Sequence, residues 1–239
     1  LPESINSPTF RDLKDMLRRH RFVYLKPTGG SLGRGIMRLT YKPRQGYFMR
    51  YRRGGQNTLL RFTKFAGLQR AVRQRTGSLK RYVCQQGIRL VEIDRCPIDF
   101  RFHLNKDLSN NWVVAGIGAK KAGRGSVTTH LRNGGKLLTP EQALNATFGA
   151  RAGEILEKAK HETIKLAEMI ERNSKRRVGE LGFDIGIDNK GNIWMFEANA
   201  KPGRSIFKHP ALKKQGRRSL RLIVEYCMYL SKFRPGSDG

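Results

Sequence analysis

The chain has 239 residues, 38% of them hydrophobic, and it carries 48 Lys and Arg against 19 Asp and Glu, a formal net charge of +29. This composition is typical of one large or two small folded units and excludes a disordered chain. No apolar run approaches the roughly 18 residues of a membrane span, and the start "LPESINSPTF" lacks the features of a signal peptide, so a cytoplasmic protein without a membrane partner is expected.

Short segments rich in β-branched and aromatic residues predict strands, and apolar residues recurring every three to four positions predict helices. In chain order we expect a helix at 10–20, strands at 22–26, 36–40 and 47–51, a helix at 60–75, strands at 81–86, 98–104 and 112–119, a helix at 151–171, strands at 181–187 and 193–197, and a helix at 220–230. The irregular order favours an α+β fold over a regular βαβ repeat. A change of composition near residue 80 predicts a small basic subdomain followed by a larger one.

Positive charge is concentrated in the first part of the chain. No acidic residue occurs between Asp15 and Glu92, and this stretch holds 19 Lys and Arg. Such a field attracts polyanions, which include nucleotide phosphates, nucleic acid, anionic surfaces and acidic proteins, and charge alone does not choose among them. A generally basic, solvated surface is the alternative interpretation.

Three cysteines without CxxC spacing predict neither a zinc site nor disulfides, and we expect buried thiols at Cys84, Cys96 and Cys227.

The segment "VYLKPTGGSLGRGI" combines an apolar strand, a lysine and a glycine-rich loop. Glycine-rich turns expose backbone N–H groups that can cradle phosphate oxygens, while Lys26 supplies a full positive charge. The segment is not a P-loop, because the lysine precedes the glycines. A structural hairpin turn would also use these glycines, so both interpretations stay open at this point.

A second segment, "GFDIGIDNKGNIWMFEANAKPGR", reads as two strands joined by a turn, with Asp184 on the first strand and Glu197 and Asn199 on the second. Residues two apart in a strand point to the same side, so Glu197 and Asn199 can converge on one point. Two carboxylates and an amide oxygen are hard ligands that suit Mg²⁺. An ordinary exposed hairpin is the alternative interpretation.

Five motifs in order resemble the ATP-grasp superfamily. "EANAKPG", preceded by "GFD", is similar to the metal-binding signature; the lysine and glycine loop resembles the lid; and "YVCQQGI", "PIDFRFHL" and "WVVAGIGAKKAGRGSVTTHLRNGG" resemble the hinge strand, the Asp-x-Arg strand and the strand that ends in Gly-Gly. The likeness runs from residue 22 to the end and is greatest to the YheC/YheD branch, which is described as endospore coat-associated. It implies an α+β ATP-grasp fold with an N-terminal segment and helix at 1–21, a lid at 22–80 and a larger metal-binding subdomain at 81–239, with ATP between the two subdomains.

The resemblance also implies roles for individual residues. Asp184, Glu197 and Asn199 would bind Mg²⁺, with Mn²⁺ as an alternative, and Arg101, Lys120 and Arg204 would act in catalysis. The residues expected to bind ATP are Lys26, Thr28, Gly29, Gly30, Ser31, Gly33, Gly35, Cys84, Gln85, Gln86, Gly87 and Glu92, with Asp94 as an alternative to Glu92 at the ribose. The Cys84–Gly87 backbone, together with Gln86, would face adenine.

Departures from the family pattern bear on activity. His130 stands where such proteins often place an asparagine, and Lys120 stands where an arginine is common, which loses bidentate recognition of phosphate or carboxylate. The domain that usually precedes the lid has no room in residues 1–21, so we expect either a fragment or a chain that dispenses with that domain.

Two functions from different classes follow from the resemblance. The first is an ATP- and Mg²⁺-dependent carboxylate–amine ligase that forms an acyl phosphate on an acidic peptide or protein, in the cytoplasm or in spore coat formation. The second is a nucleotide-binding coat or polyanion-binding protein with little or no ligase activity, and an ATP-grasp kinase is a further alternative. Nucleic acid is a partner that we do not favour, and the sequence predicts no oligomeric state.

Overall fold

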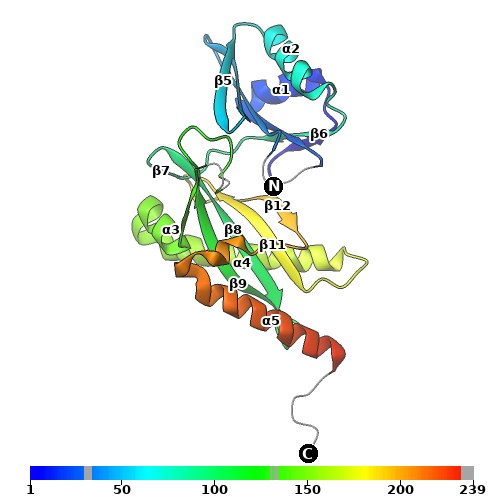
Figure 1. The fold of residues 1–239 in the computed structure, drawn as a ribbon, viewed down its shortest axis with the longest axis vertical. Coiled ribbons are helices and arrows are strands. Elements are labelled where there is room, and N and C mark those ends of the chain that lie inside the picture. The colour runs from blue at the N-terminus through cyan, green and yellow to red at the C-terminus, as the bar shows by residue number, and fades with distance from the viewer. Residues whose placement is uncertain (30–33, 130, 132–133, 233–239) are drawn as a thin grey trace, which may run out of the picture. The chain divides into compact units, whose positions relative to one another are not determined.

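A computed structural model describes residues 1–29, 34–129, 131 and 134–232. The chain divides into two compact units (Figure 1). Unit 1 comprises Leu1–Arg89 with Ala122–Gly135, and unit 2 comprises Leu90–Lys121 with Lys136–Gly239. The subdomain boundaries expected at residues 21–22 and 80–81 stay a prediction.

Unit 1 is an antiparallel sheet of order β1-β6-β2-β3-β4-β5, with two helices packed on one face. Its elements are β1 (Ser4–Asn6), α1 (Phe10–His20), β2 (Phe22–Pro27), β3 (Met37–Lys42), β4 (Gly46–Arg53), β5 (Gln56–Phe62), α2 (Phe65–Thr76) and β6 (Tyr82–Gln86). Helix α1 begins where Thr9 and Asp12 form a capping box, and its residues Leu13, Met16 and Leu17 are fully buried against the sheet. This apolar stripe at helical spacing determines which side of helix α1 packs against the sheet.

Unit 2 is an antiparallel sheet of order β10-β9-β8-β11-β12, with β7 paired to β8. Its elements are β7 (Glu92–Ile93), β8 (Cys96–Lys106), β9 (Trp112–Lys121), β10 (Lys136–Leu138), α3 (Pro140–Phe148), α4 (Ala152–Arg172), β11 (Glu180–Ile187), β12 (Ile193–Asn199) and α5 (Lys213–Ser231), with 3₁₀ turns at Gly149–Arg151, Ser205–Lys208 and Pro210–Leu212. Helices α4 and α5 lie on opposite faces of this sheet (Figure 1).

Strand β8 shows why the two faces of the unit 2 sheet differ. In its sequence "CPIDFRFHLNK", Phe100 and Phe102 point to the face that packs on α3 and α4 and have no exposed surface, whereas Asp99, Arg101 and His103 point to the other face. The period of two separates an apolar core from a polar surface along one strand.

The structure bears out most of the expected elements and corrects the bounds of one, the helix expected at 60–75. Residues 60–62, expected in a helix, belong to strand β5, and α2 begins only at Phe65. Strands β1, β5, β7 and β10 and helix α3 were not predicted.

Cys84 and Cys96 are buried free thiols as expected, but the prediction was wrong for Cys227, which lies on the solvent face of α5.

No helix in the part of the chain that the structure describes is long and apolar enough to cross a membrane.

Candidate functional site

The polar face of the unit 2 sheet gathers six of the predicted or neighbouring site residues through strand register. Arg101 of β8 lies opposite Asp184 of β11, and Asp184 lies opposite Glu197 of β12. Residues directly opposite each other in an antiparallel sheet share a face. Asp99 lies opposite Lys120 of β9 in the same way, and the pairing of Asn199 with Gly182 places that amide on the same face.

A cluster of two cations and two carboxylates stands at the centre of this face. Asp184 Oδ2 accepts a hydrogen bond from Arg101 Nη2 at 2.9 Å, and its Oδ1 accepts one from Lys120 Nζ at 2.9 Å. Lys120 Nζ also lies 3.0 Å from Asp99 Oδ1. All four side chains are between 12% and 19% exposed, so these ion pairs are largely shielded from water.

Electrostatics keep Lys120 charged inside this cluster. Burial alone would lower the pKa of its ammonium group, but the charges of Asp99 and Asp184 outweigh burial and raise the pKa above its usual value. Lys120 therefore stays protonated at neutral pH, and two positive side chains are held in fixed positions, although the two carboxylates balance their charge. Positioned cations of this kind can stabilise charge that develops on a transferring phosphoryl group.

The predicted metal ligands form a partial donor set on this face. Asp184 and Glu197 are cross-strand partners, Glu197 is exposed, and Asn199 is half-buried. Within residues 1–29, 34–129, 131 and 134–232, no group of three His, Cys, Asp or Glu side chains lies close enough to hold a metal ion. Two carboxylates and an amide nevertheless fit Mg²⁺, which keeps several waters and needs few protein ligands.

Arg204 lies farther along the same sheet face. Its guanidinium forms an ion pair with Glu180, which precedes Asp184 by four residues in β11. Burial raises the pKa of the Glu180 carboxyl despite this partner. Arg204 thus has a protein partner of its own, separate from the Arg101–Asp184–Lys120 cluster.

Sequence reasoning assigned no role to three residues of this face, Asp99, Glu180 and His103, although Asp99 belongs to the Asp-x-Arg motif. His103 has no exposed surface, and its ring lies 4.8 Å from the ring of Phe207. Burial, followed by the charges of Arg101 and Arg204, lowers the pKa of His103 to about 4, so the imidazole is neutral at pH 7. The signal that could have found Asp99 and His103 was their spacing of two residues on either side of Arg101.

In unit 1, Lys26 is held by a chain of hydrogen bonds. Lys26 Nζ donates to Gln85 Oε1 at 2.6 Å, and Gln85 Nε2 donates to Ser4 Oγ at 3.2 Å. These contacts join β2, β6 and β1, which are adjacent in the sheet. The lysine predicted to contact phosphate is therefore oriented by its neighbour on the hinge strand.

The expected adenine-binding segment is an interior strand whose backbone is already paired. The N–H of Gln86 donates to the carbonyl of Glu3 at 2.8 Å, and that of Gly87 donates to the carbonyl of Phe22 at 3.0 Å. Cys84 faces the core, and burial raises the pKa of its thiol to about 12. Gly87 is required where it stands, because a Cβ there would lie 2.1 Å from the Phe22 ring.

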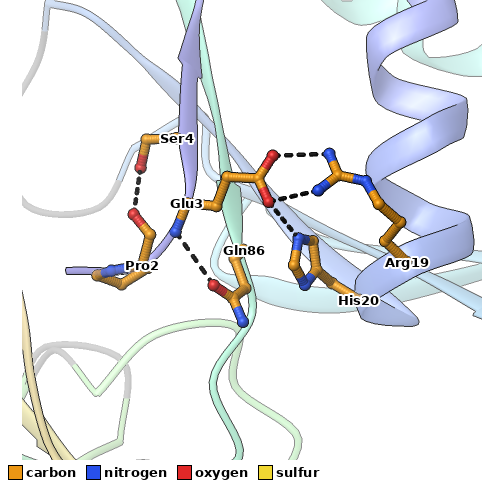
Figure 2. A network of polar contacts seen from close by, with 6 residues as sticks. All are labelled: Pro2, Glu3, Ser4, Arg19, His20 and Gln86. Carbon is orange, nitrogen blue, oxygen red and sulfur yellow. Dashed lines mark hydrogen bonds and ion pairs between the residues drawn. The ribbon is translucent and has the colours of Figure 1, made fainter.

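Glu3 anchors the first strand beside this segment (Figure 2). Its carboxylate accepts two hydrogen bonds from Arg19, both at 2.6 Å, and lies 2.7 Å from His20 Nε2. The backbone N–H of Glu3 donates to Gln86 Oε1 at 3.1 Å, as Figure 2 shows. One residue thus links helix α1 to the side chain and the backbone of Gln86.

Replacing Glu3 by glutamine is expected to loosen β1 from β6. The hydrogen bonds from Arg19 and then His20 lower the pKa of Glu3 from 4.5 to about 2, so the ion pairs stabilise the folded state above pH 4.5 and lose that contribution as the pH falls toward 2. Exchange of the Gln86 amide hydrogen, followed by NMR, should speed up by no more than about fivefold at pH 7, because the pair is partly exposed.

The difference in exchange should vanish near pH 2, where Glu3 is titrated. The control is Asp15→Asn, which removes the same charge from α1 at an exposed position. Equal exchange of wild type and Glu3→Gln at pH 7 would contradict the anchoring role.

The remaining predicted residues lie apart from these contacts. Thr28 N–H donates to the carbonyl of Arg81 at 2.9 Å, Gly29 borders open space, and Gly35 adopts a positive φ of 75°. Glu92 is exposed in unit 2, and Asp94 forms an ion pair with Lys121. The predictions for four residues lie outside the described residues: Gly30, Ser31, Gly33 and His130.

Comparison with known proteins shows the class of protein to which this fold belongs, the ATP-grasp proteins. The family described as YheC/D-like ATP-grasp matches residues 1–230, and the chain belongs to this family. It is 34% identical to the endospore coat-associated protein YheD of Bacillus subtilis (strain 168) over 233 residues, which are 97% of this chain and 51% of the relative. It is 23% identical to the endospore coat-associated protein YheC of the same organism over 223 residues, 90% of this chain and 59% of the relative.

The chain thus spans between half and three fifths of the length of these relatives. The expected resemblance and the α+β ATP-grasp fold class are confirmed.

Proposed function

We propose that the chain is an ATP- and Mg²⁺-dependent carboxylate–amine ligase that acts on a peptide or protein. The observation that carries the proposal is the Arg101–Asp184–Lys120 cluster beside Glu197, in which two cations and a carboxylate are largely shielded from water on one sheet face. Membership of the ATP-grasp family supports the use of ATP.

In the proposed reaction an oxygen of the substrate carboxylate attacks the γ-phosphorus of ATP, and ADP leaves. The amine nitrogen then attacks the acyl carbon, phosphate leaves, and the amine loses a proton. Because phosphoryl transfer depends mainly on alignment and charge neutralisation, the roles of Arg101, Lys120 and Arg204 are to offset charge on the transferred group and on the acyl phosphate.

Other predicted residues would hold the nucleotide. Lys26, oriented by Gln85, would contact phosphate oxygens, and the loop of residues 28–35 would cover them. Asp184, Glu197 and Asn199 would hold Mg²⁺ or Mn²⁺, which supplies positive charge to the phosphate oxygens when bound.

Charge supports an acidic macromolecular substrate. Unit 1 carries 23 Lys and Arg but only three acidic residues, far more positive charge than one triphosphate requires. The same observation supports a second candidate, a nucleotide-binding coat protein that uses this surface to bind polyanions. The description of the relatives YheC and YheD as endospore coat-associated supports a place in the spore coat, and a cytoplasmic location is the other part of the proposal.

Calorimetric titration with ATP tests the nucleotide and metal part of the proposal. ATP should bind at least about tenfold more tightly with Mg²⁺ than without it, because a metal held by Asp184, Glu197 and Asn199 would offset the negative charge of the phosphate oxygens. Changing Glu197→Gln together with Asn199→Ala should abolish that difference, since it removes two of the three proposed ligands.

The matched control is Glu154→Gln with Asn145→Ala, the same two changes at exposed helix positions. Unchanged metal dependence in the Glu197 and Asn199 variant would refute the metal assignment. Release of ADP with a panel of acidic peptides and amino acids then separates a ligase from a coat protein, which would bind ATP without turnover.

A further inference from the structure

A basic depression lies at one end of unit 1, remote along the strands from Lys26 and Gln85. It is formed by helix α1, the turn between β3 and β4, the end of β5 and the start of α2, and its volume is about 480 Å³. This volume falls in the range of roughly 300–1,000 Å³ that ligand sites occupy.

Five cations and no acidic residue line the depression. The cations are Lys14, Arg18, Arg44, Arg61 and Lys64. None of them forms an ion pair with another of the described residues. Of the three acidic residues of unit 1, Glu3 binds Arg19 and His20, Asp12 caps helix α1, and Asp15 does not line the depression. The charge of the depression is therefore left for an anionic partner.

Several of these cations are held in place before any ligand arrives. Arg61 Nε donates to the carbonyl of Gln45 at 3.1 Å, and its guanidinium packs 5.9 Å from the centre of the Phe48 ring. Arg44 adopts a φ of 67°, a left-handed conformation that non-glycine residues seldom occupy. Gly46 must be glycine, because its φ is 91° and a Cβ there would lie 2.3 Å from the carbonyl oxygen of Phe62. A strained turn thus fixes the base of the Arg44 side chain beside the depression.

Aromatic rings form the wall of the depression, but their faces have protein partners. The Tyr41 and Tyr47 rings stack at 4.8 Å, and Phe65 meets Tyr47 edge-on at 5.5 Å. Lys14 lies over the Phe65 ring at 5.7 Å, and Arg21 lies over the Tyr41 ring at 5.9 Å. Single-stranded nucleic acid binds by stacking its bases on free aromatic faces, which these rings do not offer. The carboxylates of an acidic peptide do not need free aromatic faces, because they can pair with the cations around the rim.

We infer that this depression binds an acidic peptide segment, whose side-chain carboxylates pair with the arginines and lysines of the rim. Arginine suits this role because its planar guanidinium binds a carboxylate through two parallel hydrogen bonds. Binding of the peptide does not require catalysis. Only the further step, that the segment belongs to the protein on which the ligase acts, rests on the proposed function.

The test is fluorescence anisotropy of labelled hexaglutamate at fixed ionic strength, with the full chain. Changing Arg18, Arg44 and Arg61 together to glutamine should weaken binding by about tenfold or more, because three ion pairs are lost. The matched control changes Arg52, Arg53 and Arg70 to glutamine, three exposed arginines of the same unit that do not line the depression. This control variant should weaken binding by less than about threefold, because it lowers the overall positive charge of the unit without removing an ion pair at the depression.

Three outcomes would overturn the inference: no binding of hexaglutamate to wild type, equal weakening by both triple variants, or tighter binding of a hexathymidylate that depends on the same three arginines. Calorimetry with ATP should give the same affinity for wild type and the depression variant. If the chain binds hexaglutamate at the depression but releases no ADP, the proposed ligase activity is refuted and the peptide-binding site is not.

Discussion

Changing Lys120 to methionine is expected to lower the free energy of unfolding of unit 2 by about 3–5 kcal/mol, because it leaves Asp99 and Asp184 in a shielded site without their shared cation. Lys120 Nζ lies 3.0 Å from Asp99 and 2.9 Å from Asp184, and the lysine side chain is 14% exposed. Urea unfolding followed by tryptophan fluorescence measures the effect, since both tryptophans, Trp112 and Trp194, belong to unit 2.

The neighbouring lysine provides the control. Lys121 follows Lys120 in β9, and its partner Asp94 has a side chain that is 78% exposed. The change Lys121→Met should therefore lower the free energy of unfolding much less than Lys120→Met does. Adding Asp99→Asn to the Lys120→Met variant should restore part of the loss, because one unpaired carboxylate is removed. Equal stability of the Lys120→Met and Lys121→Met variants would show that the cluster is not a shielded charge network.

The second large effect concerns turnover and rests on the proposed function. Changing Arg101 to methionine should lower the rate of ADP release with an acidic peptide by about 10²–10³-fold, the usual cost of losing one group that stabilises a transition-state charge. Arg101→Lys should retain part of the rate, since it keeps the charge but loses the planar fork. Initial rates at saturating ATP measure both variants.

The control for Arg101→Met is Arg221→Met on the exposed side of α5, where the arginine side chain is 77% exposed. Tryptophan fluorescence must show that unit 2 of each variant is folded at the assay temperature, because Arg101 also pairs with Asp184. A folded Arg101→Met variant with the wild-type rate would remove Arg101 from the proposed mechanism.

Much of the unit 2 sheet was predictable because its strands alternate between apolar and polar residues. The sequence of β8 sets Phe100 and Phe102 on one face and Arg101 on the other, and β11 repeats the pattern around Asp184. Alternation also predicts that Glu197 and Asn199 share a face of β12, but a bulge is needed to bring them to the face of Asp184, because Ile193 and Met195 of the same strand pack on the apolar core.

Strand register was not predictable, and it decides which side chains meet. The contact of Lys120 with both Asp99 and Asp184 depends on the pairing of β9 with β8 and of β8 with β11. A bulge between Asp184 and Ile185 further shifts the pairing with β12. The contact of Asp99 with Lys120 was therefore not predicted, although Asp99 belongs to the Asp-x-Arg motif.

The error at residues 60–62 had a local cause. Leu60 falls at helical spacing from the apolar residues of α2, and this extended the predicted helix backward. The Gly54–Gly55 pair, with φ values of 54° and 83°, forms a tight turn between β4 and β5 instead. Such a turn matches the twist of a hairpin, so the residues after it pair as a strand.

Strand β1 has a consequence for where the chain can be shortened. Its three residues occupy the outer position of the unit 1 sheet, next to β6. Trimming the chain to begin at Ser7 would turn β6 into an edge strand, with a row of unpaired N–H and C=O groups open to another molecule. The first six residues therefore prevent β6 from pairing with a strand of another molecule. A truncated form should aggregate more readily than the intact chain.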